Sequence, residues 1–508
     1  MAELADPLAG ILHQVRHRPQ APALHWRGTR VTYGGLYERA RRECDRIARL
    51  DSHPGEPVAV LADKSPEAVA LILACLLLRR PFLLPSTALA DTQLADLAAQ
   101  AGCRQVLTPE GAPGRPLPPG REQRRTPPPG TTFMLTTSGS TGLPKVVPLE
   151  AAAVHRFAAW AAPAFGIGPG TPVLNYAPLN FDLCLLDVWA SLARGAQVVL
   201  VDPERGLDGR YLLDLVLGYG VQVVQAVPMA HGLLADAAAA RGADAPSVRH
   251  ALFTGDVMPE RTLSALPGLF PRARLYNVYG CTETNDSFVH EVPRAEARAA
   301  QGPPPIGTPL PGVRALVLDE RGQQIDGAGA GELYVRTPFQ SPGYLDAAKR
   351  AERFAGHPLG QDDGRWYRTG DLVERDAAGC LRLTGRADFQ VKIRGTAVNT
   401  AEVERVLLKH PDVLEAGVAA VADPETGRRL VSAVHRAPGS GLNSLTLRGH
   451  LSRNLPRAAV PPVLRISDEP LAKTPTGKVD RGVLDHPAGG SDRRREAGNE
   501  PTAKGSPL

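Results

Sequence analysis

A loop rich in small hydroxylic residues and glycine follows a short apolar segment near residue 133. The stretch from Phe133 to Lys145 reads FMLTTSGSTGLPK. Its glycines allow the backbone to present several N–H groups to one anion, its hydroxyls add donors, and Lys145 adds positive charge. The pattern predicts a phosphate-binding loop, although a polar Gly-Ser loop taken alone is more often a plain turn. The candidate phosphate contacts are Thr137, Ser138, Gly139, Ser140, Thr141, Gly142 and Lys145.

This loop differs from the phosphate loop of P-loop NTPases. In that motif a Gly-Lys pair is followed by Ser or Thr, whose hydroxyl binds Mg²⁺. Here Lys145 follows Pro144 and precedes Val146. The sequence therefore disfavours a P-loop NTPase.

Four further segments carry residue types that suit nucleotide chemistry. Residues 277–284 read NVYGCTET, and they offer a flat ring for a base, a hydroxyl for an oxyanion and a hard oxygen ligand for a hard cation. Taken singly, Tyr279 is more often a core aromatic and Glu283 a solvated carboxylate. A lone Thr-Gly-Asp is more often a turn. The other three segments are YRTGDL at 367–372, GRADFQVKIRG at 385–395 and PTGKVDR at 475–481.

In this order, the five segments resemble the motifs of the adenylate-forming ligases, the superfamily of acyl-CoA synthetases, luciferases and the adenylation domains of nonribosomal peptide synthetases. The resemblance spans nearly the whole chain except its last residues, and it implies ATP and Mg²⁺. The roles it implies are Tyr279 at adenine, with Asn277 and Gly280 also at the nucleotide; Thr282 at phosphate; Glu283 at Mg²⁺; Asp371 and Arg386 at ribose; Asp388 at the hinge; and Lys478, Lys145, Thr282 and Glu283 in catalysis.

The resemblance also implies a reaction. A carboxylate is a poor electrophile, so it must first be converted into an acyl adenylate, which has a good leaving group. In that step the carboxylate oxygen attacks the α-phosphorus of ATP in line, pyrophosphate leaves, and negative charge accumulates on the equatorial oxygens. Lys145 and Lys478 would neutralise this charge together with Mg²⁺. Lys478 belongs to the small domain, so domain closure would gate the chemistry. Rotation about Asp388 would then admit a thiol that attacks the adenylate.

The segment Asn180 to Leu192, NFDLCLLDVWASL, resembles the start of the acid pocket in amino-acid-activating members. Asp182 would bind the α-ammonium group, whereas the alternative is a helix N-cap. The residue types carried over to this pocket indicate that the substrate is a medium-sized amino acid whose side chain ends in a polar group, cationic or hydroxylated. Carried over by spacing, the residues around the side chain are Leu183, Leu186, Gln225, Phe253, Gly255, Val278, Asp286 and Ser287.

Several positions depart from the pattern of peptide-synthetase modules. Val146 follows the loop lysine in place of glycine, Ala397 and Asn399 replace Arg and Glu, and Leu383 stands where an aromatic often packs near adenine. These departures favour a freestanding enzyme. Only 30 residues follow Lys478, whereas a carrier domain needs roughly 80 for its own core. We therefore expect the acceptor to be the phosphopantetheine thiol of a separate carrier protein.

Two other functions stay open. An acyl- or aryl-CoA ligase of the same fold is the nearest rival, but Asp182 would then face an apolar acid with an unpaired charge. A ligase-fold scaffold without activity is the second alternative. It is disfavoured because Lys145, Glu283, Asp371 and Lys478 are all present.

The predicted fold class is α/β, with a large N-terminal region of several subdomains and a small, mobile α+β C-terminal domain. Strand and helix patterns alternate along the first half of the chain, and an amphipathic stretch from Thr400 to His410, with Val403, Val406 and Leu407 on one face, follows the GRADFQVKIRG segment. The predicted domains are an adenylation core at 1–386, a lid at 387–486 with the hinge near Asp388, and a disordered tail at 487–508.

Composition excludes several classes of function. A net charge of +5 over 508 residues is too dilute to favour nucleic-acid binding. Six scattered cysteines predict neither a zinc site nor a disulfide frame. The most apolar run, Ala68 to Leu78, is too short to span a bilayer and predicts a buried helix, so a cytoplasmic protein without a membrane partner is expected. Eight lysines against 50 arginines draw attention to Lys145, Lys392 and Lys478.

Overall fold

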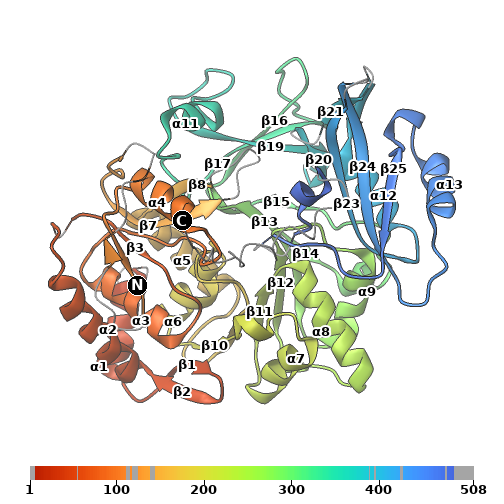
Figure 1. Ribbon diagram of the computed structural model, residues 1–508. Coiled ribbons are helices and arrows are strands. Elements are labelled where there is room, and N and C mark those ends of the chain that lie inside the picture. Colours follow the sequence, from red (N-terminus) through yellow and green to blue (C-terminus); the bar gives the residue numbers. More distant parts are fainter. Residues whose placement is uncertain are drawn as a thin grey trace, which may run out of the picture. The chain divides into compact units, whose positions relative to one another are not determined.

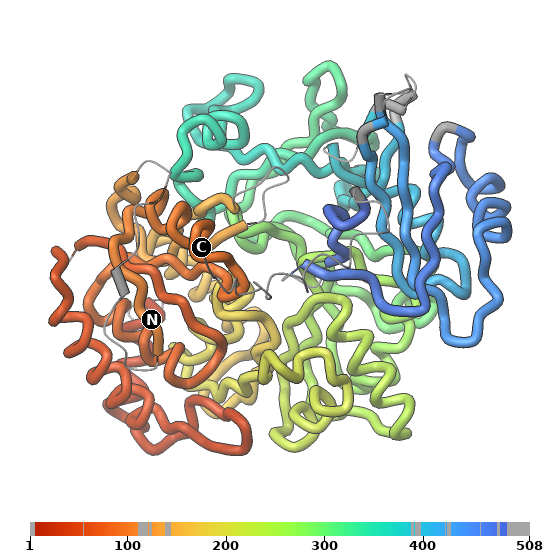
Figure 2. Tube along the Cα trace, in the orientation of Figure 1, coloured from red at the N-terminus to blue at the C-terminus, as the bar shows by residue number. Residues whose placement is uncertain are grey.

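The computed structural model describes residues 6–53, 55–109, 115–116, 120, 124–137, 144–387, 390–393, 396–423, 427–474 and 478–485. The chain divides into two compact units, Met1–Leu383 and Thr384–Leu508. Figure 2 traces the chain through both units, with the C-terminal unit in blue. The predicted hinge residue Asp388 and the predicted tail at 487–508 lie outside the described residues.

The largest sheet of the N-terminal unit is mostly parallel. Within the described ranges its strand order is β15-β14-β13-β12-β11-β9-β10-β1-β2, and the strands from β13 to β1 run parallel while β2, β14 and β15 pair antiparallel at the edges. Parallel strands of this kind need helical crossovers, which bury both faces of the sheet. The strands are β1 (Pro22–Trp26), β2 (Thr29–Thr32), β9 (Pro172–Asn175), β10 (Gln197–Leu200), β11 (Val223–Ala226), β12 (His250–Thr254), β13 (Arg274–Cys281), β14 (Asn285–Val292) and β15 (Thr308–Pro309).

Helices cover this sheet on two faces, and alternate strand residues enter two separate cores. Val223 and Leu252 pack in the core that is shared with the other sheets of this unit, whereas their neighbours Val224 and Phe253 pack in a second core under α7, α8 and α9, which lie together beside β11 and β12 (Figure 1). This alternation follows from the period of two along a strand. The helices are α1 (Pro7–His17), α2 (Tyr33–Ala48), α5 (Ala151–Ala164), the π-helix η2 (Leu185–Ala190), α6 (Ser191–Ala193), the 3₁₀-helix η3 (Pro203–Arg205), α7 (Gly209–Gly218), α8 (Pro228–Arg241), α9 (Glu260–Leu269) and α10 (Arg294–Arg298).

A second sheet carries the predicted phosphate loop. Its order over the described residues is β6-β5-β3-β4-β7-β8, and the apolar run that predicted a buried helix forms α3, in which every residue from Ala68 to Leu76 is buried. Ser65 caps this helix by accepting a hydrogen bond from the Ala68 amide at 3.1 Å. The elements are β3 (Val58–Val60), α3 (Pro66–Leu77), β4 (Phe82–Leu83), α4 (Asp91–Gln100), β5 (Gln105–Leu107), β6 (Arg115–Pro116), β7 (Thr131–Thr137) and β8 (Lys145–Glu150).

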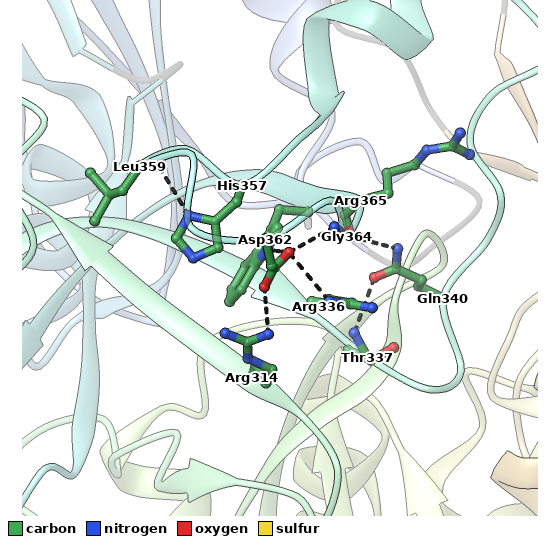
Figure 3. A network of polar contacts seen from close by, with 10 residues as sticks. Arg314, Arg336, Thr337, Gln340, His357, Leu359, Asp362, Gly364 and Arg365 are labelled. Carbon is green, nitrogen blue, oxygen red and sulfur yellow. Dashed lines mark hydrogen bonds and ion pairs between the residues drawn. The ribbon is translucent and has the colours of Figure 1, made fainter.

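A third, antiparallel sheet holds the YRTGDL segment, and a single carboxylate ties its strands together. Figure 3 shows Asp362 between the side chains of Arg314 on β16 and Arg336 on β17. The same carboxylate accepts from the Gly364 amide at 2.7 Å and from the Trp366 indole at 3.4 Å. The loop that precedes β19 is thereby anchored to two neighbouring strands. The elements are β16 (Arg314–Leu318), β17 (Gly329–Arg336), α11 (Ala347–Arg353), β18 (Phe354–Ala355), β19 (Trp366–Arg375) and β20 (Leu381–Arg386).

In its described residues, the C-terminal unit combines two small sheets with two α-helices. The predicted amphipathic stretch forms α12, and its three apolar side chains Val403, Val406 and Leu407 are buried in the core of this unit. Asn399 caps the helix by accepting from the Ala401 amide at 3.0 Å. The elements are β21 (Gln390–Ile393), β22 (Thr396–Asn399), α12 (Thr400–Leu408), β23 (Val413–Asp423), β24 (Gly427–Arg436), α13 (Ser444–Asn454), and β25 (Val463–Ser467), with 3₁₀-helices η5 (Arg457–Ala459) and η6 (Arg481–Asp485).

The α/β class predicted for the N-terminal region and the α+β class predicted for the smaller C-terminal region are confirmed. Among the residues that the structure describes, no helix has the length and apolar character needed to cross a bilayer.

Candidate nucleotide and acid site

The hairpin from β13 to β14 delivers the NVYGCTET segment to the edge of the large sheet. β13 and β14 pair antiparallel, and their register shifts between Tyr279 and Gly280. Gly280 allows the close approach of the two strands, because a Cβ at this position would lie 2.2 Å from the carbonyl oxygen of Asn285. Asn285 itself adopts a φ of 55°. This irregular hairpin places Thr282 and Glu283 at its tip.

Glu283 lies in a buried cluster with two tyrosines and the loop lysine. The carboxylate is 5% exposed and accepts from the Tyr344 hydroxyl at 2.5 Å, while Tyr344 lies 3.4 Å from the Tyr367 hydroxyl. The ammonium of Lys145 lies 4.8 Å from the centre of the Tyr344 ring. Burial lowers the pKa of Lys145, and the nearby Glu283 opposes this shift. The structure therefore brings a carboxylate, a cation and two hydroxyls together.

Backbone contacts anchor the tip of the hairpin to the segment after β17. Glu283 accepts from the Ser341 amide at 2.9 Å, and Thr284 accepts from the Thr337 hydroxyl at 2.9 Å. The Ser341 hydroxyl in turn donates to the carbonyl of Pro148 on β8 at 2.7 Å. These bonds join the hairpin to the strand that begins with the loop lysine.

Tyr279 and Asp371 are in direct contact. The Tyr279 hydroxyl donates to Asp371 at 2.5 Å, and burial, followed by the Asp371 charge, raises the pKa of Tyr279. The Asp371 amide donates to the Thr369 hydroxyl at 3.0 Å, and Gly370 between them has a φ of 76°, a conformation that glycine adopts without strain. An aromatic ring and an acceptor carboxylate thus lie together, as recognition of a base and a ribose requires.

Asp182 lies between the same hairpin and η2. This partly buried carboxylate accepts from the Thr282 hydroxyl, and burial, together with repulsion from Glu283, raises its pKa. It is not a helix N-cap, because η2 begins at Leu185 and Cys184 occupies the cap position. Among the described residues Asp182 has no ion-pair partner. A carboxylate in this environment suits a ligand that supplies positive charge.

A largely buried polar cluster that the sequence analysis did not identify lies beside η2, the helix that follows Asp182. The Lys64 ammonium donates to the carbonyls of Asn175 and Tyr176 at 3.0 and 2.8 Å. The side-chain amide of Asn175 donates to Asp187 on η2 at 3.0 Å, and the Cys184 thiol donates to the Pro178 carbonyl at 3.1 Å. Burial lowers the pKa of Lys64 and raises that of Asp187. The rarity of lysine was a usable signal for Lys64.

Comparison with known proteins is consistent with this geometry. The family model for AMP-binding enzymes matches residues 11–345, and the model for the AMP-binding enzyme C-terminal domain matches residues 402–478. This chain belongs to the AMP-binding enzyme family. The two matched regions lie in the two compact units, so the enzyme has the adenylate-forming fold with a large N-terminal α/β domain and a C-terminal domain.

Two relatives cover most of the enzyme. Phosphinothricin tripeptide synthetase PhsB of Streptomyces viridochromogenes is 32% identical over 98% of this chain, which spans 43% of PhsB. The L-proline–[L-prolyl-carrier protein] ligase of Streptomyces coelicolor is 32% identical over 89% of this chain and 91% of its own length. Among solved structures, the amide bond synthetase McbA of Marinactinospora thermotolerans superimposes with a TM-score of 0.77 at 24% identity, over 95% of this chain and 99% of McbA.

Not all predicted pocket residues of the AMP-binding enzyme share one face. Gln225 and Val278 lie on the face of the large sheet that packs toward η2, as Asn175 does, whereas Phe253 is fully buried in the second core, at 6.2 Å from the His231 ring. Gly255 follows β12 with a φ of 84°.

The other pocket positions differ in exposure and contacts. Leu186 is fully buried and Leu183 partly buried. The Ser287 hydroxyl is committed to the Asn285 carbonyl and Thr284 hydroxyl, both at 3.2 Å. Of the predicted pocket residues, Phe253 is thus engaged by core packing and Ser287 by hydrogen bonds within the hairpin.

Several predicted residues are placed apart from this cluster or not described. Thr137 and Lys145 are register partners on β7 and β8, at the two ends of the predicted phosphate loop, but Ser138, Gly139, Ser140, Thr141 and Gly142 lie outside the described residues, as does Asp388. Asn277 donates to the Pro305 carbonyl at 2.8 Å. In the C-terminal unit, Arg386 ends β20 and Lys478 is exposed. Tyr344, which contacts Glu283, was not predicted.

Proposed function

We propose that this AMP-binding enzyme activates an amino acid as aminoacyl-AMP with release of pyrophosphate, and then transfers the aminoacyl group to the phosphopantetheine thiol of a separate carrier protein. The observation that carries the proposal is Asp182. It is a partly buried carboxylate bonded to Thr282 and next to the Glu283 cluster, and no cation among the described residues forms an ion pair with it. An α-ammonium group would compensate its charge and would hold the substrate carboxylate near the nucleotide.

In this proposal, different residues of the N-terminal unit bind different parts of ATP. Tyr279 offers a ring for adenine and Asp371 an acceptor for the ribose hydroxyls. Lys145 stands at the end of the phosphate loop, where its charge would stabilise the negative charge that develops on the phosphoryl oxygens. Burial of Lys145 strengthens this interaction, because the effective dielectric constant is lower there than in water.

Glu283 is the candidate ligand for Mg²⁺. Among the described residues, no group of three or more His, Cys, Asp or Glu side chains is placed to hold a metal ion. A single carboxylate nevertheless fits Mg²⁺, which is usually held by one or two carboxylates together with substrate phosphates and water. When bound, Mg²⁺ would neutralise charge on the phosphates of ATP. The Tyr344 hydroxyl holds the Glu283 carboxylate in position for this role.

Lys478 is the candidate for the second catalytic cation. It is exposed in the C-terminal unit, and its carbonyl accepts from the Thr474 amide at 2.7 Å. Among the described residues its side chain has no hydrogen-bond or ion-pair partner, so its ammonium is available to a substrate. In this proposal it would bridge the substrate carboxylate and the phosphate during adenylation.

The carrier protein as acceptor is supported by the relative from Streptomyces coelicolor, whose name describes ligation of L-proline to a carrier protein. An acyl- or aryl-CoA ligase is the alternative. It would leave Asp182 facing an uncharged acid, which costs desolvation without compensation.

The decisive experiment is substrate-dependent pyrophosphate exchange over a panel of α-amino acids, β-amino acids, fatty acids and benzoates. We expect exchange with amino acids and not with fatty acids or benzoates. In the same assay Lys478→Ala should lower exchange by at least roughly 10²-fold while ATP binding is largely retained. Lys409→Ala, at another exposed lysine of the same unit, is the matched control. Exchange at the wild-type rate in Lys478→Ala would refute the role of this lysine.

The transfer step is tested separately, by incubating the enzyme, ATP and the activated amino acid with stand-alone carrier proteins or coenzyme A. Mass spectrometry of the acceptor should show an added aminoacyl group on a carrier protein. Acylation of coenzyme A alone would favour the ligase alternative.

A further inference from the structure

A second carboxylate, Asp286, lies near Asp182, and one of its oxygens has no hydrogen-bond partner in the part of the chain that the structure describes. Asp286 is 8% exposed, and its Oδ2 atom is buried with no hydrogen-bond partner among the described residues. Its backbone is held firmly, because its amide donates to the Asn285 side chain at 2.7 Å and its register partner is Gly280. The unpaired oxygen is therefore a fixed feature of the β13–β14 hairpin.

The charge of Asp182 disfavours ionisation of Asp286. Burial, and then the charge of Asp182, raise the pKa of Asp286 to about 8. Within the described part of the chain, no lysine or arginine forms an ion pair with either carboxylate. Buried carboxylates are ordinarily paired with a cation or with hydrogen-bond donors. Asp182 accepts from the Thr282 hydroxyl, but among the described residues neither carboxylate has a cation and Asp286 Oδ2 has no donor, so a ligand that supplies positive charge would compensate both.

A further unsatisfied acceptor lies in the same unit. Gln225 is 2% exposed, and its side-chain oxygen has no hydrogen-bond partner among the described residues. It lies on the face of the large sheet that packs toward η2, the helix that follows Asp182. Asp286 and Gln225 thus both offer acceptors and no compensating donor, which favours a ligand rich in N–H groups.

We propose that the substrate is a diamino acid, whose α-ammonium group binds Asp182 and whose side-chain ammonium group binds Asp286. This inference rests on the proposed function and narrows it to one substrate class. Two ammonium groups compensate two carboxylates, so the loaded pocket carries no unpaired charge apart from the reacting carboxylate. An amino acid with a single amine would leave Asp286 either protonated or buried as an uncompensated anion.

The experiment compares amino acids that differ only by the second amine: alanine with 2,3-diaminopropionate, 2-aminobutyrate with 2,4-diaminobutyrate, and norvaline with ornithine. kcat/KM is measured for each by pyrophosphate exchange, and the adenylate is identified by mass spectrometry. At the side-chain length that fits, we expect the diamino acid to exceed its partner about 10- to 100-fold in kcat/KM. Asp286→Asn should reduce this ratio at least about tenfold, because the amide cannot pair with an ammonium charge.

The control is Asp244→Asn, which makes the same change of charge at an exposed carboxylate of the same unit and should leave the ratio within about twofold. The wild-type comparison decides the question even if Asp286→Asn does not fold. A ratio at or below one for all three pairs would overturn the diamino acid proposal and leave amino acid activation intact. Exchange with fatty acids or benzoates alone would overturn both.

Discussion

Replacing Lys64 with methionine removes the cation that lies beside Asp187 in the interior of the N-terminal unit. Lys64 is 4% exposed and Asp187 fully buried. Their charges are linked through Asn175, whose carbonyl accepts from Lys64 and whose side-chain amide donates to Asp187, each at 3.0 Å. Methionine is about as long as lysine but cannot donate, so the Tyr176 carbonyl loses this donor, whereas the Asn175 carbonyl keeps the Val201 amide at 3.1 Å.

The expected loss in the free energy of unfolding follows from the cost of leaving a buried charge without its partner. Breaking a buried charged pair costs about 3 to 5 kcal/mol. Because Asn175 bridges the pair, we expect the free energy of unfolding to fall by about 3 kcal/mol for Asp187→Leu and by about 4 kcal/mol for Lys64→Met, which also removes a donor from the Tyr176 carbonyl. The double variant contains neither charge, so it should lose about 2 to 3 kcal/mol less than the sum of the two single losses.

Tryptophan fluorescence during urea unfolding isolates the relevant unit. All four tryptophans (Trp26, Trp160, Trp189 and Trp366) belong to the N-terminal unit, and Trp189 is buried on η2 two residues from Asp187. Lys349→Met, at another lysine of this unit, should change the free energy of unfolding by no more than about 0.5 kcal/mol. If the double variant loses as much free energy of unfolding as the two single variants together, within about 0.5 kcal/mol, the proposed coupling between Lys64 and Asp187 is refuted.

Three further predictions concern the site. Burial raises the pKa of Asp286 from its ordinary value of 3.8 to about 8 in the folded enzyme, so the stability contributed by its protonated form is complete below about pH 4 and is lost as the pH rises through about 8. Asp286→Asn should remove this pH dependence and stabilise the unliganded enzyme by on the order of 5 kcal/mol at pH 9, measured by urea unfolding from pH 5 to 9. Tyr279→Phe loses the bond to Asp371 and should raise the KM for ATP about 3- to 10-fold with little change in kcat, whereas an unchanged KM would argue against this contact in nucleotide binding. Tyr344→Phe releases the Glu283 carboxylate and should lower kcat about tenfold, with a matching rise in the Mg²⁺ concentration needed for half-maximal exchange; the same Mg²⁺ requirement as the wild type would contradict the positioning role.

The local features of the fold were predictable because their causes are local. The apolar run after Ser65 forms α3, and the spacing of Val403, Val406 and Leu407 predicts the buried face of α12. Both follow from the helical period of 3.6 residues and from side chains that cap the helix beginning. The nucleotide motifs were equally visible, since glycine, hydroxyl and carboxylate residues occur there in consecutive positions.

The pocket was only partly predictable, because the face of a strand residue depends on register. Spacing placed Phe253 and Val278 together, whereas the pairing of β12 with β13 puts Phe253 in the second core and Val278 on the side of η2. A shift of one residue exchanges the two faces of a strand. No local pattern reveals such a choice.

From the sequence alone follow the α/β class, the order of the nucleotide motifs and the candidate role of Asp182, because these depend on residue types at short spacing. Only the tertiary structure decided which distant side chains meet: Lys64 with Asn175 and Asp187, Glu283 with Tyr344, and Asp182 with Asp286. The physical reason is that burial and proximity set the energy of a charge, and segments separated by tens to more than one hundred residues become neighbours only when sheets and helices pack.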